Sequence, residues 1–109
     1  MNLQTPFEMN ITVQSIHFDA DTKLVELIKG KLSKLSLFHD NIISAEVGLK
    51  LEHDGTDREN KIVEMKIVVP GRELFAKRRG KIFEEAVSTT AEALRSQLIR
   101  TKERLRAAS

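Results

Sequence analysis

Side chains that could carry out covalent or metal chemistry are few in this sequence and poorly spaced for it. His17, His39 and His53 stand far apart, and none has a second histidine or a carboxylate at metal-ligand spacing on its predicted element. Glu84 and Glu85 are neighbours, and adjacent side chains of a helix point in different directions. The chain has no cysteine, no glycine-rich phosphate loop and no serine-centred nucleophile motif. We therefore predict that the protein is not an enzyme and uses no metal, cofactor or small-molecule substrate.

The basic side chains are better organised, and the chemistry that they offer is contact with phosphate. Residues 1–76 contain nine Lys or Arg against twelve Asp or Glu, a net charge of −3. Residues 77–109 contain nine Lys or Arg against four Glu, a net charge of +5, although the whole chain carries only +2. Such asymmetry is typical of a chain with a polyanion-binding end. A C-terminal helix that is simply well solvated is the alternative explanation.

Three groups of basic residues could form one interface. Lysines recur on one flank of the first predicted helix, four basic residues bracket Gly80 before the last predicted helix, and that helix carries two basic stripes. If the helices lie side by side, these groups merge into a ridge that suits RNA phosphates. The alternative is that the side chains only extend along the helix edges. The predicted RNA-binding residues are Lys23, Lys31, Lys34, Lys77, Arg78, Arg79, Lys81, Arg95, Arg100, Lys102, Arg104 and Arg106.

The composition favours folded RNA over a single strand. The chain contains no Trp or Tyr and only five Phe, most of which a core would need. Single-strand binders rely on aromatic side chains that stack with bases. Folded RNA is recognised mainly through its shape and its phosphates. We therefore predict binding to structured RNA.

Six elements must position these residues. Alternation of apolar and polar residues predicts strands, and apolar residues at helical spacing predict helices. The predicted strands cover residues 9–16, 43–52 and 63–69, and a shorter strand around residues 74–77 leads to Gly80. The predicted helices cover residues 21–38 and 81–106. Asp54-Gly55 and Pro70-Gly71 are predicted turns.

The order β-α-β-β-β-α predicts an α+β fold in one domain, residues 1–109. The first helix would join two parallel strands by a right-handed crossover, and the later strands would form an antiparallel meander. Each strand has one apolar face, so both helices should pack on the same face of a four-stranded mixed sheet. The other face should be polar and solvated. Residues 1–8 carry no clear pattern and are predicted to be disordered, and both Met1 and Met9 are candidate starts.

The chain resembles the ribosome hibernation promoting factors, also called ribosome-associated inhibitors or sigma-factor modulation proteins. The similarity runs from about Met9 to Arg106. Its residues are Asn10-Ile11-Thr12, Gly30-Lys31-Leu32-Ser33-Lys34-Leu35, Ala76, Gly80, Ala86-Val87, Leu94, Gln97-Leu98, Arg100 and Lys102. The chain departs from the family at Ile82 and Glu84, where an Asp and a Tyr are usual, and at Ala93 and Ser96, which are usually basic. Arg95 and the basic residues 77–81 could replace that charge.

The resemblance implies a fold similar to that of double-stranded RNA-binding domains. It also implies a translation inhibitor that binds the RNA of the small ribosomal subunit in the mRNA and tRNA channel and promotes ribosome hibernation in slow growth. Because the chain ends directly after its last helix, it resembles the short family members. Off the ribosome, a monomer is expected.

The expected location is the cytoplasm. A chain without cysteine suits a reducing compartment. No apolar run approaches the roughly 20 residues that cross a membrane, and residues 1–9 do not resemble a secretory signal.

Two other functions compete with ribosome binding. The first is a protein-binding regulator that uses the open sheet face around Phe75, as the sigma-factor name of the family suggests. The second is a general double-stranded RNA binder, which shares the phosphate chemistry but not the target.

Overall fold

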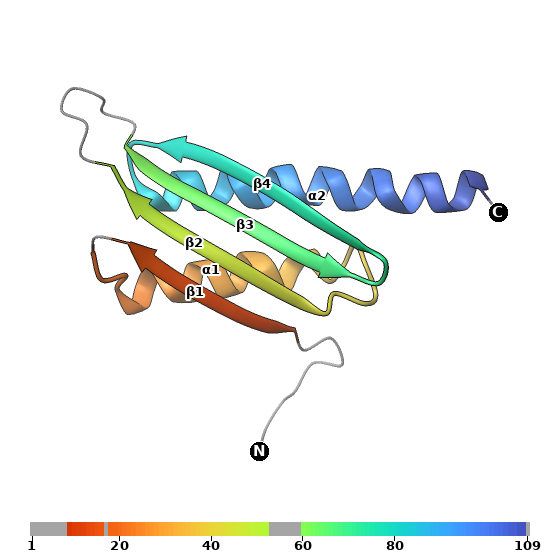
Figure 1. The fold of residues 1–109 in the computed structure, drawn as a ribbon, viewed down its shortest axis with the longest axis horizontal. Coiled ribbons are helices and arrows are strands. Elements are labelled where there is room, and N and C mark those ends of the chain that lie inside the picture. Colours follow the sequence, from red (N-terminus) through yellow and green to blue (C-terminus); the bar gives the residue numbers. More distant parts are fainter. Residues whose placement is uncertain (1–8, 17, 53–59, 109) are drawn as a thin grey trace, which may run out of the picture.

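The computed structural model describes residues 9–16, 18–52 and 60–108. It contains the predicted β-α-β-β-β-α order, and the elements are arranged as Figure 1 shows. Residues 1–8, His17, His53 and the predicted turn at Asp54-Gly55 lie outside the described residues. The elements are β1 (Asn10–Ile16), α1 (Thr22–Leu35), β2 (Ser44–Leu51), β3 (Lys61–Val69), β4 (Arg72–Gly80) and α2 (Phe83–Ala108).

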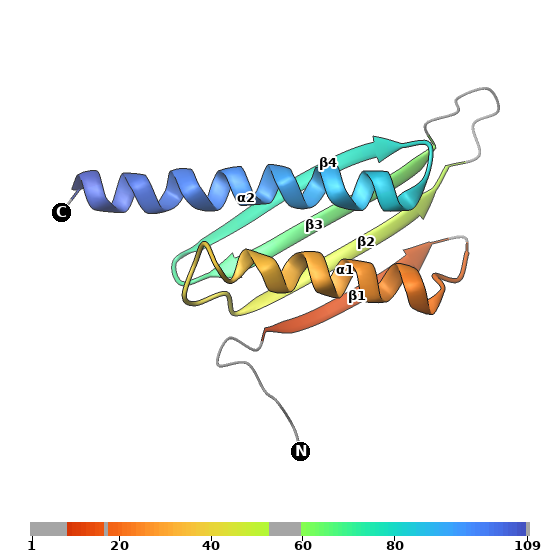
Figure 2. The same ribbon diagram turned by 180° about the vertical axis from the view of Figure 1, so that it is seen from behind.

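The four strands form one sheet in the order β1-β2-β3-β4. β1 is parallel to β2, with Val13 opposite Val47, and the two later pairs are antiparallel. A parallel pair needs a crossover connection, which α1 supplies. Figure 2 shows both helices side by side on one face of this sheet, which confirms the predicted α+β mixed-sheet fold.

The core lies between the sheet and the two helices. In β3 the alternate residues Val63, Met65 and Ile67 face the helices and are fully buried. α1 buries one apolar stripe against the sheet, and α2 buries a longer one that includes Leu94 and Leu98. Each helix therefore keeps its opposite side and its flanks available for polar residues.

Helix α1 is shorter than the sequence predicted, because it ends at Leu35 and not at residue 38. Asp21 caps its start, where the Asp21 carboxylate accepts a 2.8 Å hydrogen bond from the backbone N–H of Leu24. After Leu35 the Phe38 N–H donates to the Leu35 carbonyl at 2.9 Å, a tight turn that replaces the helical bond. Phe38 still packs against the core from this turn, so its apolar periodicity continues past the helix.

Strand β4 is longer than the sequence predicted and spans nine residues. Each of them pairs with a residue of β3, and Lys77 Nζ lies 3.9 Å from Glu64 Oε1 across the two strands. Pairing with the apolar strand β3 therefore extends β4 over charged residues, which have a low strand propensity of their own. Gly71 makes the preceding turn with φ of 77°, a backbone conformation that glycine adopts without strain.

Helix α2 begins at Phe83, two residues later than predicted, and spans 26 residues. Gly80 lets the chain turn tightly into it, because a Cβ at Gly80 would lie 3.1 Å from the Ile82 carbonyl oxygen and 3.3 Å from Ala86 Cβ. At about 1.5 Å per residue the helix is roughly 39 Å long, whereas nine strand residues span about 30 Å. Its C-terminal end extends beyond the sheet in Figures 1 and 2.

Candidate nucleic-acid interface

The two helices enclose a groove that three of the predicted RNA-binding residues line. Lys31 and Lys34 line it from α1, and Arg95 lines it from α2. The groove has a volume of about 260 Å³. Its other lining residues are Leu35, Leu37, Phe38, Ser88, Ala91 and Glu92.

Helical periodicity explains why these cations meet. Lys31 and Lys34 directly precede the buried residues Leu32 and Leu35, so they lie on the flank of α1 that faces α2. Arg95 follows the buried Leu94 and lies on the facing flank of α2. The predicted approach of the basic flanks of the two helices is therefore confirmed for these three residues.

Arg95 is held by one neighbour from the turn after α1 and by one neighbour from α2. Its guanidinium carbon lies 5.0 Å from the centroid of the Phe38 ring, within the range of a cation–π interaction. Its Nη1 donates to Glu92 Oε1 at 2.7 Å, one turn earlier on α2. Sequence reasoning missed the roles of Phe38 and Glu92. The i, i+3 spacing of Glu92 and Arg95 was a signal for the ion pair, whereas no sequence signal pairs Arg95 with Phe38.

Other predicted cations extend this basic surface along the helices. Lys102 is exposed and lies seven residues after Arg95, which places it on the same side of α2. At the other end, Phe18 and Phe83 stack with ring centroids 4.6 Å apart and bring the start of α1 close to the start of α2. The exposed Lys23 and Lys81 lie near this contact in the chain.

The predicted single ridge is wrong for Lys77 and Arg79. Because β4 continues to Gly80, strand alternation puts both residues on the open sheet face together with Phe75. Both make ion pairs there, Lys77 with Glu64 at 3.9 Å and Arg79 with Glu52 at 2.9 Å.

Arg78 and Arg100 also lie apart from the groove. Arg78 lies on the helix-facing side of β4, because it alternates in step with Leu74 and Ala76. Its guanidinium donates to the Lys77 carbonyl at 2.8 Å. Arg100 lies on the outer flank of α2, beside Arg72 and Thr101 of a separate hollow. The backbone of α2 includes Arg104 and Arg106, whose side chains lie outside the described part of the structure.

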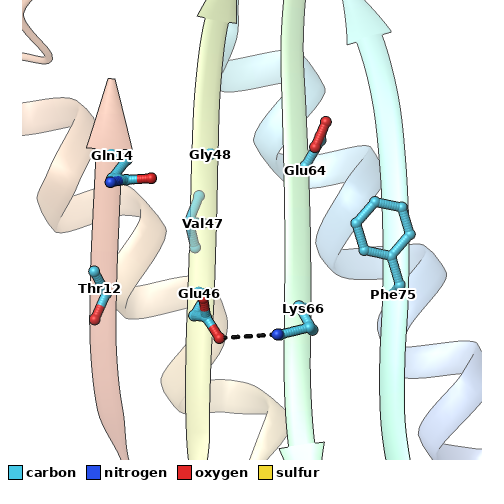
Figure 3. Close-up of a pocket in the computed structure, with 8 residues that line it drawn as sticks. All are labelled: Thr12, Gln14, Glu46, Val47, Gly48, Glu64, Lys66 and Phe75. Atoms are coloured by element: carbon cyan, nitrogen blue, oxygen red, sulfur yellow. Dashed lines mark ion pairs between the residues drawn. The ribbon is translucent and has the colours of Figure 1, made fainter. Parts of the chain in front are cut away.

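The open sheet face carries a different kind of surface, which Figure 3 shows in close-up. A shallow hollow of about 330 Å³ lies over Gly48, with Thr12, Glu46, Glu64 and Phe75 among its lining residues. Phe75 is 53% exposed.

Acidic and basic side chains alternate on this face. Lys66 lies at the centre, with Nζ 3.1 Å from Glu46 and 3.8 Å from Glu73. The hydrogen bond to Glu46 and the charges of both carboxylates raise the pKa of Lys66 above its ordinary value of 10.5. The register that puts Glu46 opposite Lys66 forms this cluster, which the sequence reasoning did not identify.

The charges of the two faces differ in their availability to phosphate. In the groove three cations stand against one carboxylate, Glu92, which Arg95 already contacts. On the open face Lys66, Lys77 and Arg79 each lie within ion-pair distance of a glutamate. The groove therefore offers a polyanion two lysines without an ion pair in the described structure, whereas these three cations of the open face are paired.

Two further properties limit the chemistry of the described residues. Within residues 9–16, 18–52 and 60–108, no three His, Asp or Glu side chains gather as a metal site would require. Neither of the helices in the described structure is long and apolar enough to cross a membrane.

The fold and its basic helical layer define an α+β protein with a groove suited to anions. A family model described as Sigma 54 modulation protein / S30EA ribosomal protein matches residues 11–106. The chain belongs to this family, which confirms the resemblance found in the sequence. No curated protein gives a significant sequence match.

Solved structures share the fold at low sequence identity. A ribosomal subunit interface protein from Coxiella burnetii is 22% identical with a TM-score of 0.77, and the match covers 87% of this chain and 99% of that one. The N-terminal domain of Thermus thermophilus Protein Y is 19% identical with a TM-score of 0.75, and the match covers 85% of this chain and 99% of that one.

Proposed function

We propose that this protein is a non-enzymatic, cytoplasmic translation inhibitor that associates with ribosomes. It binds the RNA of the small subunit in the mRNA and tRNA channel and promotes hibernation in slow growth. The observation that carries the proposal is the groove in which Lys31, Lys34 and Arg95 converge on a rigid helical layer. Family membership and the similarity to a ribosomal subunit interface protein support the choice of target.

The proposed contacts are phosphates of folded RNA. Lysine and arginine side chains on rigid helices contact phosphate with little loss of conformational freedom. The groove residues form the centre of the interface, and Lys23, Lys81 and Lys102 extend it along the helices. Arg104 and Arg106 belong to the same proposal, because they continue α2 past the sheet.

Four predicted residues have weaker support as RNA contacts. Lys77 and Arg79 lie on the opposite sheet face in ion pairs. Arg78 and Arg100 lie away from the groove, although the RNA could reach them around the edge of the sheet. The proposal assigns the main binding energy to the helix side.

Sedimentation of lysate from stationary-phase cells on a sucrose gradient tests this function. The protein should travel with particles that contain the small subunit, as a monomer when it is released by salt. Exclusion from all ribosomal fractions would contradict the proposal. An excess of unrelated double-stranded RNA should not displace the protein, because displacement is the behaviour of a general double-stranded RNA binder.

A protein-binding regulator is the second candidate, and the exposed Phe75 is the observation that favours it. Its ring borders the hollow over Gly48, and an apolar side chain of a partner could bind there against the ring. The variant Phe75→Asp separates the two functions, because it should leave ribosome binding intact if the helix side carries the activity.

A further inference from the structure

Arg95 is oriented more firmly than a typical surface arginine. The Phe38 ring, from the turn after α1, lies on one side of its guanidinium, and Glu92 receives a hydrogen bond from Nη1. The side chain is nonetheless 44% exposed. A planar group that is fixed on one face and accessible from solvent offers a stacking surface to a ligand.

The groove beside Arg95 combines an apolar floor with a cationic rim. Leu35 and Ala91 are buried beneath it, and Leu37 is 78% exposed at its edge. Its volume of about 260 Å³ lies below the roughly 300–1,000 Å³ of pockets for drug-sized ligands. A groove of this size and lining suits one flat group.

The positive charge of the rim indicates that a flat ligand in this groove is joined to anionic groups. Lys31 and Lys34 have no ion-pair partner within the described structure, whereas Glu92 is already engaged by Arg95. The ligand is therefore planar and joined to anions. A nucleotide meets both requirements, and Arg guanidinium planes are known stacking partners of unpaired bases in folded RNA.

We infer that Arg95 stacks with one unpaired base of a folded RNA, while Lys31 and Lys34 hold the phosphates on either side of it. Phe38 also lines the groove, and its ring orients the Arg95 guanidinium that stacks with the base. The inference rests on the proposed function and deepens it, since it adds a base site to an interface otherwise made of phosphate contacts. It also supplies the stacking surface that a chain without Trp and Tyr lacks.

Two RNA hairpins of the same length test the inference, one fully paired and one with a single bulged 2-aminopurine. The wild-type protein should bind the bulged hairpin about tenfold more tightly than the paired one. Only the bulged hairpin offers an unpaired base in its stem, and stacking of one base contributes about that much affinity. Binding should also quench the fluorescence of the 2-aminopurine. Equal affinity for the two hairpins overturns the inference.

Arg95→Lys keeps the charge and removes the planar group. This variant should lose the preference for the bulge and the quenching. Phe38→Leu should reduce the preference, because it keeps an apolar side chain but no ring. Arg72→Lys is the matched control and should retain the full preference, because Arg72 begins β4 and lines a separate hollow beside the outer flank of α2. A preference that survives in Arg95→Lys overturns the inference.

The outcomes distinguish this inference from the proposed function. If the wild-type protein associates with ribosomes but does not discriminate between the hairpins, only the base site is wrong. If it binds neither ribosomes nor either hairpin, both proposals fail. Tight binding of a polyglutamate peptide in the groove, with no preference for the bulge, would overturn the base site in favour of an acidic protein partner.

Discussion

The side-chain amide of Gln97 donates a 2.8 Å hydrogen bond to the main-chain carbonyl oxygen of Phe75. This bond joins α2 to the outer edge of β4, which is an edge strand of the sheet. A second edge carbonyl, that of Lys77, accepts from the Arg78 guanidinium. The free backbone groups of an edge strand can pair with another chain, so these side chains protect the edge against self-association.

Replacing Gln97 with Leu should therefore have two effects. The free energy of unfolding should fall by about 1 kcal/mol, the usual net contribution of one hydrogen bond. The protein should also form dimers at lower concentration in analytical ultracentrifugation, because the Phe75 carbonyl is then available. Gln14→Leu on β1 is the control. If Gln97→Leu matches Gln14→Leu in both measurements, Gln97 has no protective role.

Truncation of the core should destabilise the protein strongly. Leu49 and Leu94 are both completely buried in the cluster between the sheet and the helices. Leu49→Ala or Leu94→Ala should each lower the free energy of unfolding by about 2–5 kcal/mol. Urea denaturation measures the loss. Lys31→Glu should change stability by no more than about 0.5 kcal/mol, and a large loss in that variant would mean that Lys31 is structural.

The contribution of Lys66 to stability should depend on pH. Its pKa is raised in the folded protein, chiefly by the hydrogen bond to Glu46, above the ordinary value of 10.5. A raised folded-state pKa gives stability that is complete below 10.5 and is lost as the pH rises through the folded value. Lys66→Met should therefore melt below the wild type at neutral pH, and the difference should vanish in strongly alkaline buffer. A difference independent of pH would rule out this ion cluster as its cause.

Local patterns explain how much of the fold could be predicted from the sequence. The alternation through β2 and β3 and the apolar stripes of the helices encode their own burial, so they predicted the topology and the core. The predicted C-terminal end of α1 was wrong, because Phe38 continues the apolar periodicity although it lies in a turn. That turn packs on the same core as the helix. A periodic pattern records burial and does not distinguish a helix from a turn beside it.

The candidate site was harder to predict because it depends on contacts between elements. Placing Arg79 required the true length of β4, which its pairing with β3 determines. The contact between Phe38 and Arg95 joins residues 57 positions apart, and no local pattern encodes it. The sequence nevertheless predicted that Lys31, Lys34 and Arg95 approach each other, because each lies next to a buried stripe.

Ribosome binding should weaken steeply with salt. If about five phosphates are neutralised, the logarithm of the affinity should fall against the logarithm of the salt concentration with a slope of about −4. Lys31→Glu should make the slope shallower by about one unit, because one contact is lost. Filter binding over a series of KCl concentrations measures both slopes. A slope near zero would indicate an interface without phosphate contacts, as a protein partner would give.

Ribosome co-sedimentation of two double variants tests most directly whether the helix side carries ribosome binding. Lys31→Glu with Lys34→Glu reverses two charges in the groove, and Lys77→Glu with Arg79→Glu reverses two on the open sheet face. Both variants change the net charge equally, so only position differs. Circular dichroism first establishes that each is folded. If the helix side binds the RNA, the groove variant should leave the ribosomal fractions while the sheet-face variant stays with them. Loss of the sheet-face variant from the ribosome, together with retention of the groove variant, would contradict binding by the helix side.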